Sequence, residues 1–163
     1  MELIDGKKIA EEIKREIARK AAEIIDAEQT PPHLAAILVG NDPASETYIA
    51  SKEKACRAVG FTSSVYRYPA EISEQQLLEA VDFLNNDEEV HGFIVQLPLP
   101  RHIDANKVIE RINPAKDVDG FHPVNVGRLA LGLPSYVPAT PASIVLLLEK
   151  SGIETEGKNC VVL

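Results

Sequence analysis

The sequence lacks tryptophan, and phenylalanine and tyrosine together supply only 5% of its residues. It also lacks an excess of basic residues, since 17 lysines and arginines face 25 aspartates and glutamates and leave a formal net charge of -8. Nucleic-acid binding depends on clustered lysines and arginines that neutralise phosphates. The charge therefore argues against a nucleic-acid partner. The basic residues near the start, such as Lys7, Lys14 and Arg19, alternate with acids and predict a solvated helix face.

Cysteine is scarce as well. Cys56 and Cys160 lie far apart in the sequence and both have apolar neighbours. We expect two reduced thiols in the core instead of a disulfide, which fits a cytosolic protein. No charged, apolar and small-residue signal segment opens the sequence, and its apolar runs are far shorter than a membrane span. These absences predict a cytoplasmic protein that has no membrane partner.

The composition that is present suits one domain with a core: 163 residues, 45% hydrophobic and 26% charged. Helical and strand patterns alternate along it. The patterns predict helices over 6–27, 45–59, 73–85 and 104–112, and strands over 34–39, 61–68 and 91–96. This order implies an α/β fold with a mostly parallel sheet and helices on both faces, which is a three-layer α-β-α domain.

The pattern loosens in the last third. The segment 113–138 is rich in Gly, Pro, Asn and Asp, which predicts a loop with one short helix over 124–130. Thr140 and Pro141 predict a helix start with Thr140 as its N-cap. The final residues, 158–163, have the apolar pattern of a buried strand. Since a strand cannot bury itself alone, we expect the sequence to stop where a second α/β domain begins.

Tyr48 and Lys52 are the first candidates for chemistry. They lie four residues apart on the predicted helix 45–59, so their side chains share one face. A partly buried lysine can act as an acid or a base, and a tyrosine ring can stack on a flat ligand. This spacing is common, and the alternative is a surface lysine with a tyrosine at the rim of the core.

Gln96 is the next candidate because it follows the apolar run 93–95 and needs partners if it is buried. Those partners are either Lys52 or a ligand, or else the backbone of the core. Ligands of parallel sheets bind beyond the carboxyl ends of the strands, which would bring Gln96 into one cleft with Tyr48. A phenol, an amine and an amide in one cleft indicate an enzyme with a planar heterocyclic substrate.

Two carboxylates stand in the loop from Asp117 to Gly120, at Asp117 and Asp119. A metal site would need more oxygen or histidine ligands than the neighbouring His122 supplies, so we expect no metal. A plain turn is one interpretation of the loop. The other interpretation is that one of these carboxylates binds an amino group on the ring of a ligand.

Taken together, ordered blocks of the sequence resemble the FolD family of bifunctional methylenetetrahydrofolate dehydrogenases and methenyltetrahydrofolate cyclohydrolases. The blocks run over essentially the whole chain and comprise the Tyr48/Lys52 helix, 74–78 with Val81, Leu84, Asn85 and Asp87, then 93–99, 116–121 and 125–129. The resemblance implies that 5,10-methylenetetrahydrofolate is oxidised with NADP (or NAD) to 5,10-methenyltetrahydrofolate, which is then hydrolysed to 10-formyltetrahydrofolate. This chemistry belongs to one-carbon metabolism and purine biosynthesis.

The resemblance also implies roles for site residues. Lys52 would assist the proton transfers of the hydrolytic step, Tyr48 would stack on the folate, and Gln96 would hold Lys52 or polarise a water or substrate atom. Asp119 would bond the edge of the pterin ring. Further folate contacts are expected from Ser45, Leu97, Pro98 and Leu99.

The resemblance further implies how the chain is divided. Residues 1–140 would form the folate-binding catalytic domain, 141–156 a linker helix and loop, and 157–163 the first strand of an NAD(P)-binding, Rossmann-like domain. The glycine-rich turn that cradles the cofactor phosphates would follow that strand, so no residue of this chain is expected to bind the cofactor. The complete protein would be a homodimer. Ala139 stands where the family often has cysteine, so a thiol there cannot be essential.

Two other functions compete with this one. The chain could be a non-catalytic folate-binding or protein-interaction module without a cofactor domain, which is disfavoured because the sequence ends within the expected strand. An α/β hydrolase would need a serine in a Gly-x-Ser-x-Gly turn, and the sequence has none.

Overall fold

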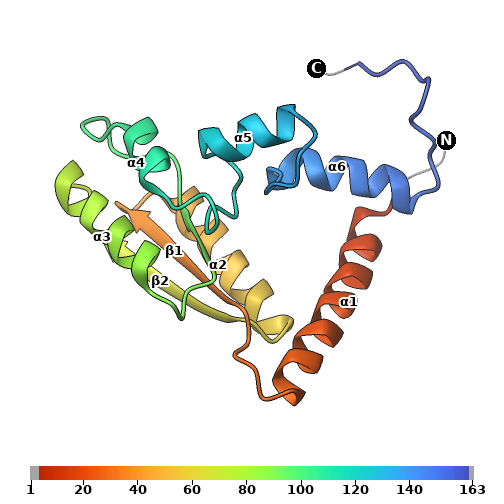
Figure 1. The fold of residues 1–163 in the computed structure, drawn as a ribbon, viewed down its shortest axis with the longest axis horizontal. Helices are drawn as coiled ribbons and strands as arrows, with labels where there is room; N and C mark the ends of the chain where they lie inside the picture. Colours follow the sequence, from red (N-terminus) through yellow and green to blue (C-terminus); the bar gives the residue numbers. More distant parts are fainter. Residues whose placement is uncertain (1–3, 162–163) are drawn as a thin grey trace.

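The structure is a computed structural model that describes residues 4–161. Within those residues the structure contains a sheet of three parallel strands in the order β2-β1-β3, which lies on the left in Figure 1, between α2 and α3. The strands are β1 (His33–Val39), β2 (Thr62–Tyr68) and β3 (Gly92–Val95). Leu34 of β1 pairs with Ser63 of β2 and with Gly92 of β3. Because all three strands run in the same direction, their carboxyl ends meet at one edge of the sheet.

Helices cover both faces of this sheet. They are α2 (Pro43–Ala58) on one face, and α3 (Glu74–Asn86) with α4 (Ala105–Arg111) on the other. Successive strand side chains point to opposite faces, so Leu38 packs with Ile49 of α2, whereas Ile37 packs with Leu77 of α3. The predicted three-layer α-β-α arrangement is confirmed.

Local capping sets where two of these helices begin. The Asp42 carboxylate accepts a hydrogen bond from the Ser45 backbone N–H at 2.8 Å, and Pro43 occupies the first turn. Helix α2 therefore begins two residues before the predicted position, at an Asp-Pro signal. At α3, Ser73 and Gln76 form the reciprocal capping box that their spacing predicts.

Replacing Ser73 by alanine is expected to lower the free energy of unfolding by about 1 kcal/mol, because the Gln76 N–H then loses its acceptor. Urea denaturation measures this change. Ser51→Ala is the matched control, since Ser51 is an exposed residue in the interior of α2 and alanine is a better helix former there. Equal stability of the Ser73 variant and the parent would contradict the importance of the cap.

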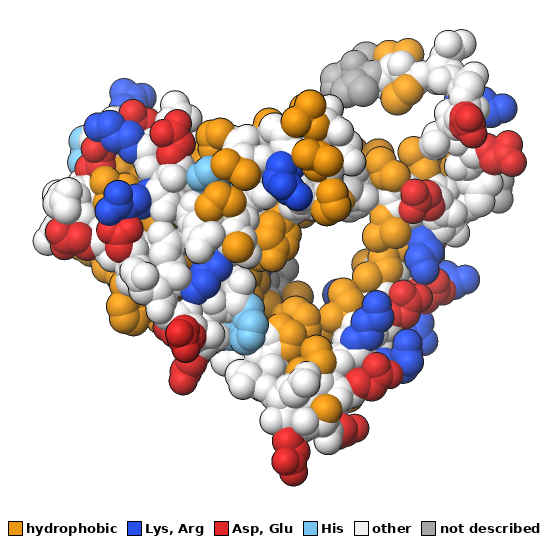
Figure 2. Space-filling model, in the orientation of Figure 1, with side chains coloured by type: hydrophobic (Ala, Val, Ile, Leu, Met, Phe, Trp, Pro, Cys, Tyr) orange, Lys and Arg blue, Asp and Glu red, His pale blue; other side chains and the backbone are white. Residues whose placement is uncertain are grey.

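Three further helices lie outside the two helical layers that cover the sheet. They are α1 (Gly6–Asp26), α5 (Pro123–Ala130) and α6 (Ala139–Lys150). Figure 1 shows α1 extending away from the sheet, with its N-terminal end next to α6. Lys150, the last residue of α6, pairs with Glu16 in the middle of α1 at 3.3 Å. Figure 2 shows charged side chains along the outer side of α1 and hydrophobic ones on its inner side. The predicted amphipathic character of α1 is confirmed.

Two expectations about single residues are wrong. Helix α6 begins at Ala139, with Pro138 as its N-cap residue and no side-chain cap, so Thr140 lies inside the first turn instead of capping it. Cys56 is buried as expected, but Cys160 is exposed, because the segment around it packs against nothing among residues 4–161. The helices of that same stretch of chain include none with the length and apolarity to cross a membrane.

The expected strand at the end of the chain is not formed over residues 158–161, which are exposed and have no regular structure. A strand gains its hydrogen bonds from a neighbouring strand, and residues 158–161 pair with none of the three described strands. The remaining two residues of the expected strand, 162 and 163, lie outside the described residues. The domain boundaries inferred from the sequence stay a prediction.

Candidate active site

A pocket of about 560 Å³ opens at the carboxyl end of β3. Four parts of the chain form it: one face of α2, the end of β3 with the residues after it, the loop after Asp117, and the start of α6. Its lining consists of Tyr48, Lys52, Val95, Gln96, Leu97, Asp119, Phe121, Pro138, Ala139, Thr140 and Pro141. The structure thus brings together the phenol, amine, amide and carboxylate that the sequence singled out.

Lys52 and Gln96 are directly bonded in this pocket. The Lys52 ammonium donates to Gln96 Oε1 at 3.3 Å, while Gln96 Nε2 donates to the Leu97 carbonyl at 2.7 Å. The Gln96 backbone N–H donates to the Ile37 carbonyl of β1 at 2.9 Å, which fixes the residue to the edge of the sheet. Gln96 therefore turns its oxygen toward Lys52 and holds the end of a long, otherwise mobile side chain.

Tyr48 lies one helical turn before Lys52 on α2, and 63% of its surface is exposed. An aromatic side chain with this much free surface, at the rim of a pocket, can stack on a flat ligand. This exposure is equally compatible with the alternative from the sequence, an aromatic residue at the rim of the core.

Asp119 is the carboxylate of the pocket. Burial raises its pKa above the usual range, the Lys52 charge acts in the opposite direction, and the Asp117 carboxylate raises it further. None of the side-chain hydrogen bonds found among residues 4–161 uses the Asp119 carboxylate. The group is therefore available to a ligand that can donate hydrogen bonds to it.

Asp117 has a different task from Asp119. It is 1% exposed, and its Oδ2 accepts hydrogen bonds from the His122 N–H at 2.8 Å and from Asn125 Nδ2 at 2.9 Å. Its carboxylate thus ties the loop to the start of α5. Both ring nitrogens of His122 have partners within the protein, because Nδ1 accepts from the Val124 N–H and caps α5, and Nε2 lies 3.3 Å from the Glu110 carbonyl.

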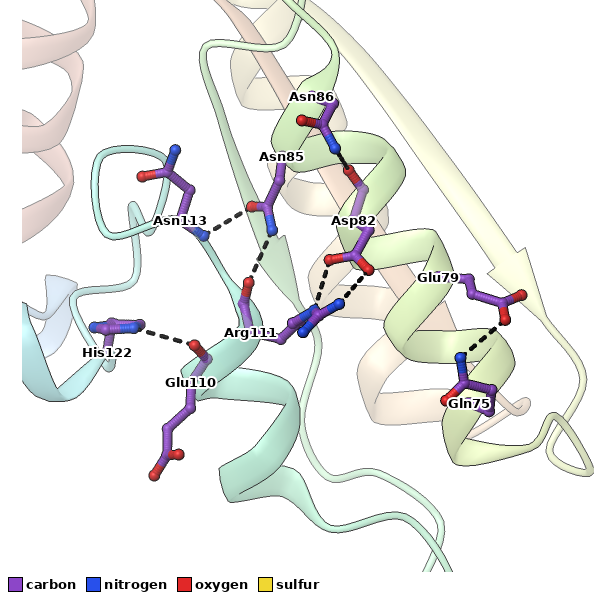
Figure 3. A network of polar contacts seen from close by, with 9 residues as sticks. All are labelled: Gln75, Glu79, Asp82, Asn85, Asn86, Glu110, Arg111, Asn113 and His122. Atoms are coloured by element: carbon purple, nitrogen blue, oxygen red, sulfur yellow. Dashed lines mark hydrogen bonds and ion pairs between the residues drawn. The ribbon is translucent and has the colours of Figure 1, made fainter.

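A polar network between α3 and α4 holds the segment that leads from α4 to the Asp117 loop (Figure 3). Arg111 binds Asp82 through two hydrogen bonds of 2.6 and 2.7 Å. Asn85 donates to the Arg111 carbonyl and accepts from the Asn113 N–H. The chain is therefore held in position where it leaves α4, as far as Asn113, which lies four residues before Asp117.

Comparison with known proteins decides the family. Residues 4–119 match the family model described as "Tetrahydrofolate dehydrogenase/cyclohydrolase, catalytic domain". The chain belongs to this family. It is 60% identical to the bifunctional protein FolD of Bacteroides thetaiotaomicron over 100% of this chain and 56% of that one. It is 59% identical to the Porphyromonas gingivalis FolD over 99% of this chain and 54% of the other. The chain spans about half the length of these curated relatives.

Solved structures of the tetrahydrofolate dehydrogenase/cyclohydrolase family share the fold. The Campylobacter jejuni FolD enzyme superposes with a TM-score of 0.91 at 45% identity, over 94% of this chain and 54% of that one. The Trypanosoma brucei enzyme, solved in complex with NADP and an inhibitor, gives a TM-score of 0.91 at 36% identity, over 96% of this chain and 54% of its own. The resemblance and the fold class predicted from the sequence are both confirmed.

The pyrophosphate of a dinucleotide such as NADP is commonly held by a glycine-rich turn between a strand and a helix. Between β1 and α2 the turn contains one glycine, Gly40, and no two glycines of the sequence stand two positions apart, so a Gly-x-Gly-x-x-Gly turn is absent from it. We assign none of these residues to NADP.

Three residues predicted to contact the folate lie outside the lining of the pocket. Ser45 is buried at the start of α2, seven residues before Lys52, where its N–H bonds Asp42. Pro98 is exposed, and Leu99 packs against the core beneath α3. Of the loop after Gln96, the structure places only Leu97 in the lining.

One wall of the pocket is formed by Pro138–Pro141 together with Phe121. None of these residues was predicted as a site residue, and only the family resemblance, through Ala139, pointed to the segment 138–141. Phe121 is 45% exposed, and its position directly after Asp119 and Gly120 was the one local signal that could have suggested it. The wall 138–141 reaches the pocket through a contact with Gly120, which no local pattern encodes.

Proposed function

We propose that the complete protein oxidises 5,10-methylenetetrahydrofolate to 5,10-methenyltetrahydrofolate with NADP and hydrolyses that product to 10-formyltetrahydrofolate. In this proposal the chain supplies the folate pocket of a bifunctional FolD enzyme. The observation that carries it is the bonded pair of Lys52 and Gln96 in one pocket with Tyr48 and Asp119, in a member of this family.

Each side chain has a part in this proposal. The pterin ring stacks on Tyr48, and its edge, which carries N–H donors, meets the Asp119 carboxylate. The methenyl carbon then lies near Lys52, whose position Gln96 fixes. The residues of this chain therefore bind and orient the folate for both reactions, and the hydride acceptor is held elsewhere in the complete protein.

The hydrolytic step needs proton transfers that Lys52 can assist. A water oxygen bonds to the methenyl carbon, the bond from that carbon to N5 breaks, and N5 takes up a proton. One further proton leaves to solvent, so the cation and water give the neutral formyl product and a proton. A positioned acid or base contributes about 10²- to 10⁴-fold to steps of this kind.

On the basis of family membership, we also propose a location, an oligomeric state, a metabolic role and a domain division for the complete protein. The complete protein would be a cytoplasmic homodimer in one-carbon metabolism and purine biosynthesis, without a membrane or nucleic-acid partner. The net charge of -8 supports the last point. Its parts would be the folate domain 1–140, the linker 141–156 and the start of an NAD(P)-binding domain at 157–163.

Titration with a folate analogue tests the proposed site. The complete protein is expected to bind it saturably, and Tyr48→Ala is expected to weaken binding about fivefold, since a stacked aromatic pair contributes about 1 kcal/mol. Tyr48→Phe is the matched control, because it keeps the ring and should bind like the parent.

No binding by the complete protein would refute the proposed function. Binding that is equally tight in Tyr48→Ala would place the folate away from this pocket.

A further inference from the structure

Gly120 stands where the loop after Asp117 meets the segment that leads into α6. Its φ is +69°, and a Cβ at this position would lie 2.9 Å from the Tyr136 carbonyl oxygen and 3.1 Å from both Cδ and N of Pro138. Ordinary carbon contacts need about 3.5 Å or more. The backbone of 136–138 therefore occupies space that any side chain at Gly120 would need.

The two sides of this contact differ in how firmly they are held. On the side of Gly120, the Asp117 carboxylate binds His122 and Asn125, and the Phe93 N–H of β3 donates to the Lys116 carbonyl at 2.9 Å. On the other side, the one described backbone hydrogen bond of 136–138 runs from the Ala142 N–H to the Pro138 carbonyl at 3.1 Å, and the Tyr136 hydroxyl donates to the Ala115 carbonyl at 3.2 Å. A side chain at Gly120 would therefore displace the segment 136–141 more readily than the loop.

We propose that Gly120 is a positioning residue of the folate pocket: by having no side chain, it lets the wall Pro138–Pro141 close on Lys52, Gln96 and Asp119. The ligand named here rests on the proposed function. The contact itself does not, because it follows from the backbone positions alone.

The chain offers a matched control for this idea. Gly132 has a φ of +67°, close to that of Gly120, but a Cβ there would meet nothing within 4 Å. Gly120→Ala and Gly132→Ala thus place alanine in the same left-handed backbone conformation. They differ in the collision with Tyr136 and Pro138.

We would compare the two variants with the parent in the complete protein by two measurements. The first is hydrogen exchange of the backbone amides in 136–142, which needs no ligand. The second is the cyclohydrolase KM and kcat. Gly120→Ala is expected to speed exchange in 136–142 and to raise KM about tenfold, since small displacements of positioning groups have effects of up to about 100-fold. Gly132→Ala is expected to match the parent in both.

Three results would overturn the proposal. If Gly120→Ala has the same hydrogen exchange in 136–142 and the same KM as the parent, the contact at Gly120 does not determine the position of the wall. Equal changes in both variants would assign the effect to backbone strain. A lower kcat with unchanged KM and exchange would indicate a smaller folded fraction. Failure of the proposed function would be recognised separately, as a complete protein without folate activity, and the exchange measurement would then still decide whether Gly120 sets the wall.

Discussion

Lys52→Met is expected to lower the proposed cyclohydrolase activity of the complete protein by at least about 100-fold, because it removes the group proposed to transfer protons in the pocket and keeps a side chain of similar length. The loss should appear in kcat more than in folate binding. Tyr48 and Asp119, which make the proposed contacts with the ring, are left in place. The rate of methenyltetrahydrofolate hydrolysis, followed by its absorbance, measures the effect.

Lys54→Met is the matched control for this experiment. Lys54 lies two residues away on the same helix, is exposed, and is not part of the pocket. Its replacement removes the same charge from α2 and should leave hydrolysis at the parental rate. A folate titration of both variants separates a catalytic loss from a binding loss. Parental hydrolysis by Lys52→Met would remove Lys52 from the mechanism.

The helices and strands around this site could be predicted from the sequence because their signals are local. Strand β1 has a run of apolar residues closed by Gly40, and α3 has a capping box followed by leucines at helical spacing. Even the start of α2, which was placed two residues late, has a local signal in Asp42 and Pro43. Where a short stretch determines its own conformation, the type of each element was predicted correctly and its bounds to within about two residues.

Expectations that depended on distant contacts fared differently. Thr140 has the local pattern of an N-cap, yet α6 begins at Ala139. The residue before it, Pro138, lies against Gly120 in space. Cys160 has apolar neighbours in sequence but none that cover it in space. The wall 138–141 likewise enters the site through packing against a residue nearly twenty positions away, so no window of the sequence contains both partners.

The same limit applies to Asp117 and Asp119, which the sequence presents as equivalent members of one loop. The bridge between Phe93 and Asp117 fixes the register of the loop against β3, and this register decides which carboxylate turns inward. Asp117 then meets two N–H donors, whereas Asp119 faces the pocket. Substitution of each carboxylate should therefore have opposite consequences for stability.

Asp117→Ala is expected to lower the free energy of unfolding by about 3 kcal/mol, because hydrogen bonds to a charged group contribute about 1.5–3 kcal/mol each and two are lost. For a chain of this length, the melting temperature should fall by roughly 6–12 °C. Thermal unfolding of the complete protein, followed at the folate domain, measures the change. A melting temperature within a degree or so of the parent's would show that α5 holds the loop without this carboxylate.

Asp119→Asn should behave in the opposite way. Burial raises the pKa of Asp119 in the folded protein, so the folded state binds a proton more tightly than the unfolded state, and the stability linked to that proton is lost as the pH rises through the folded pKa. Because asparagine does not ionise, Asp119→Asn removes this loss of stability at high pH. The variant should be at least as stable as the parent at neutral pH, with the gain disappearing below the ordinary aspartate value of 3.8.

Folate binding should weaken in Asp119→Asn, since the amide is neutral and turns one oxygen acceptor into a donor. A variant that is stable but binds poorly, beside an Asp117 variant that is unstable, would assign ligand recognition to Asp119 and support of the loop to Asp117. Parental folate binding by Asp119→Asn would leave the pterin edge without its proposed partner. A loss of stability at neutral pH would mean that the charged Asp119 carboxylate helps to hold the fold, contrary to the direction in which burial acts on it.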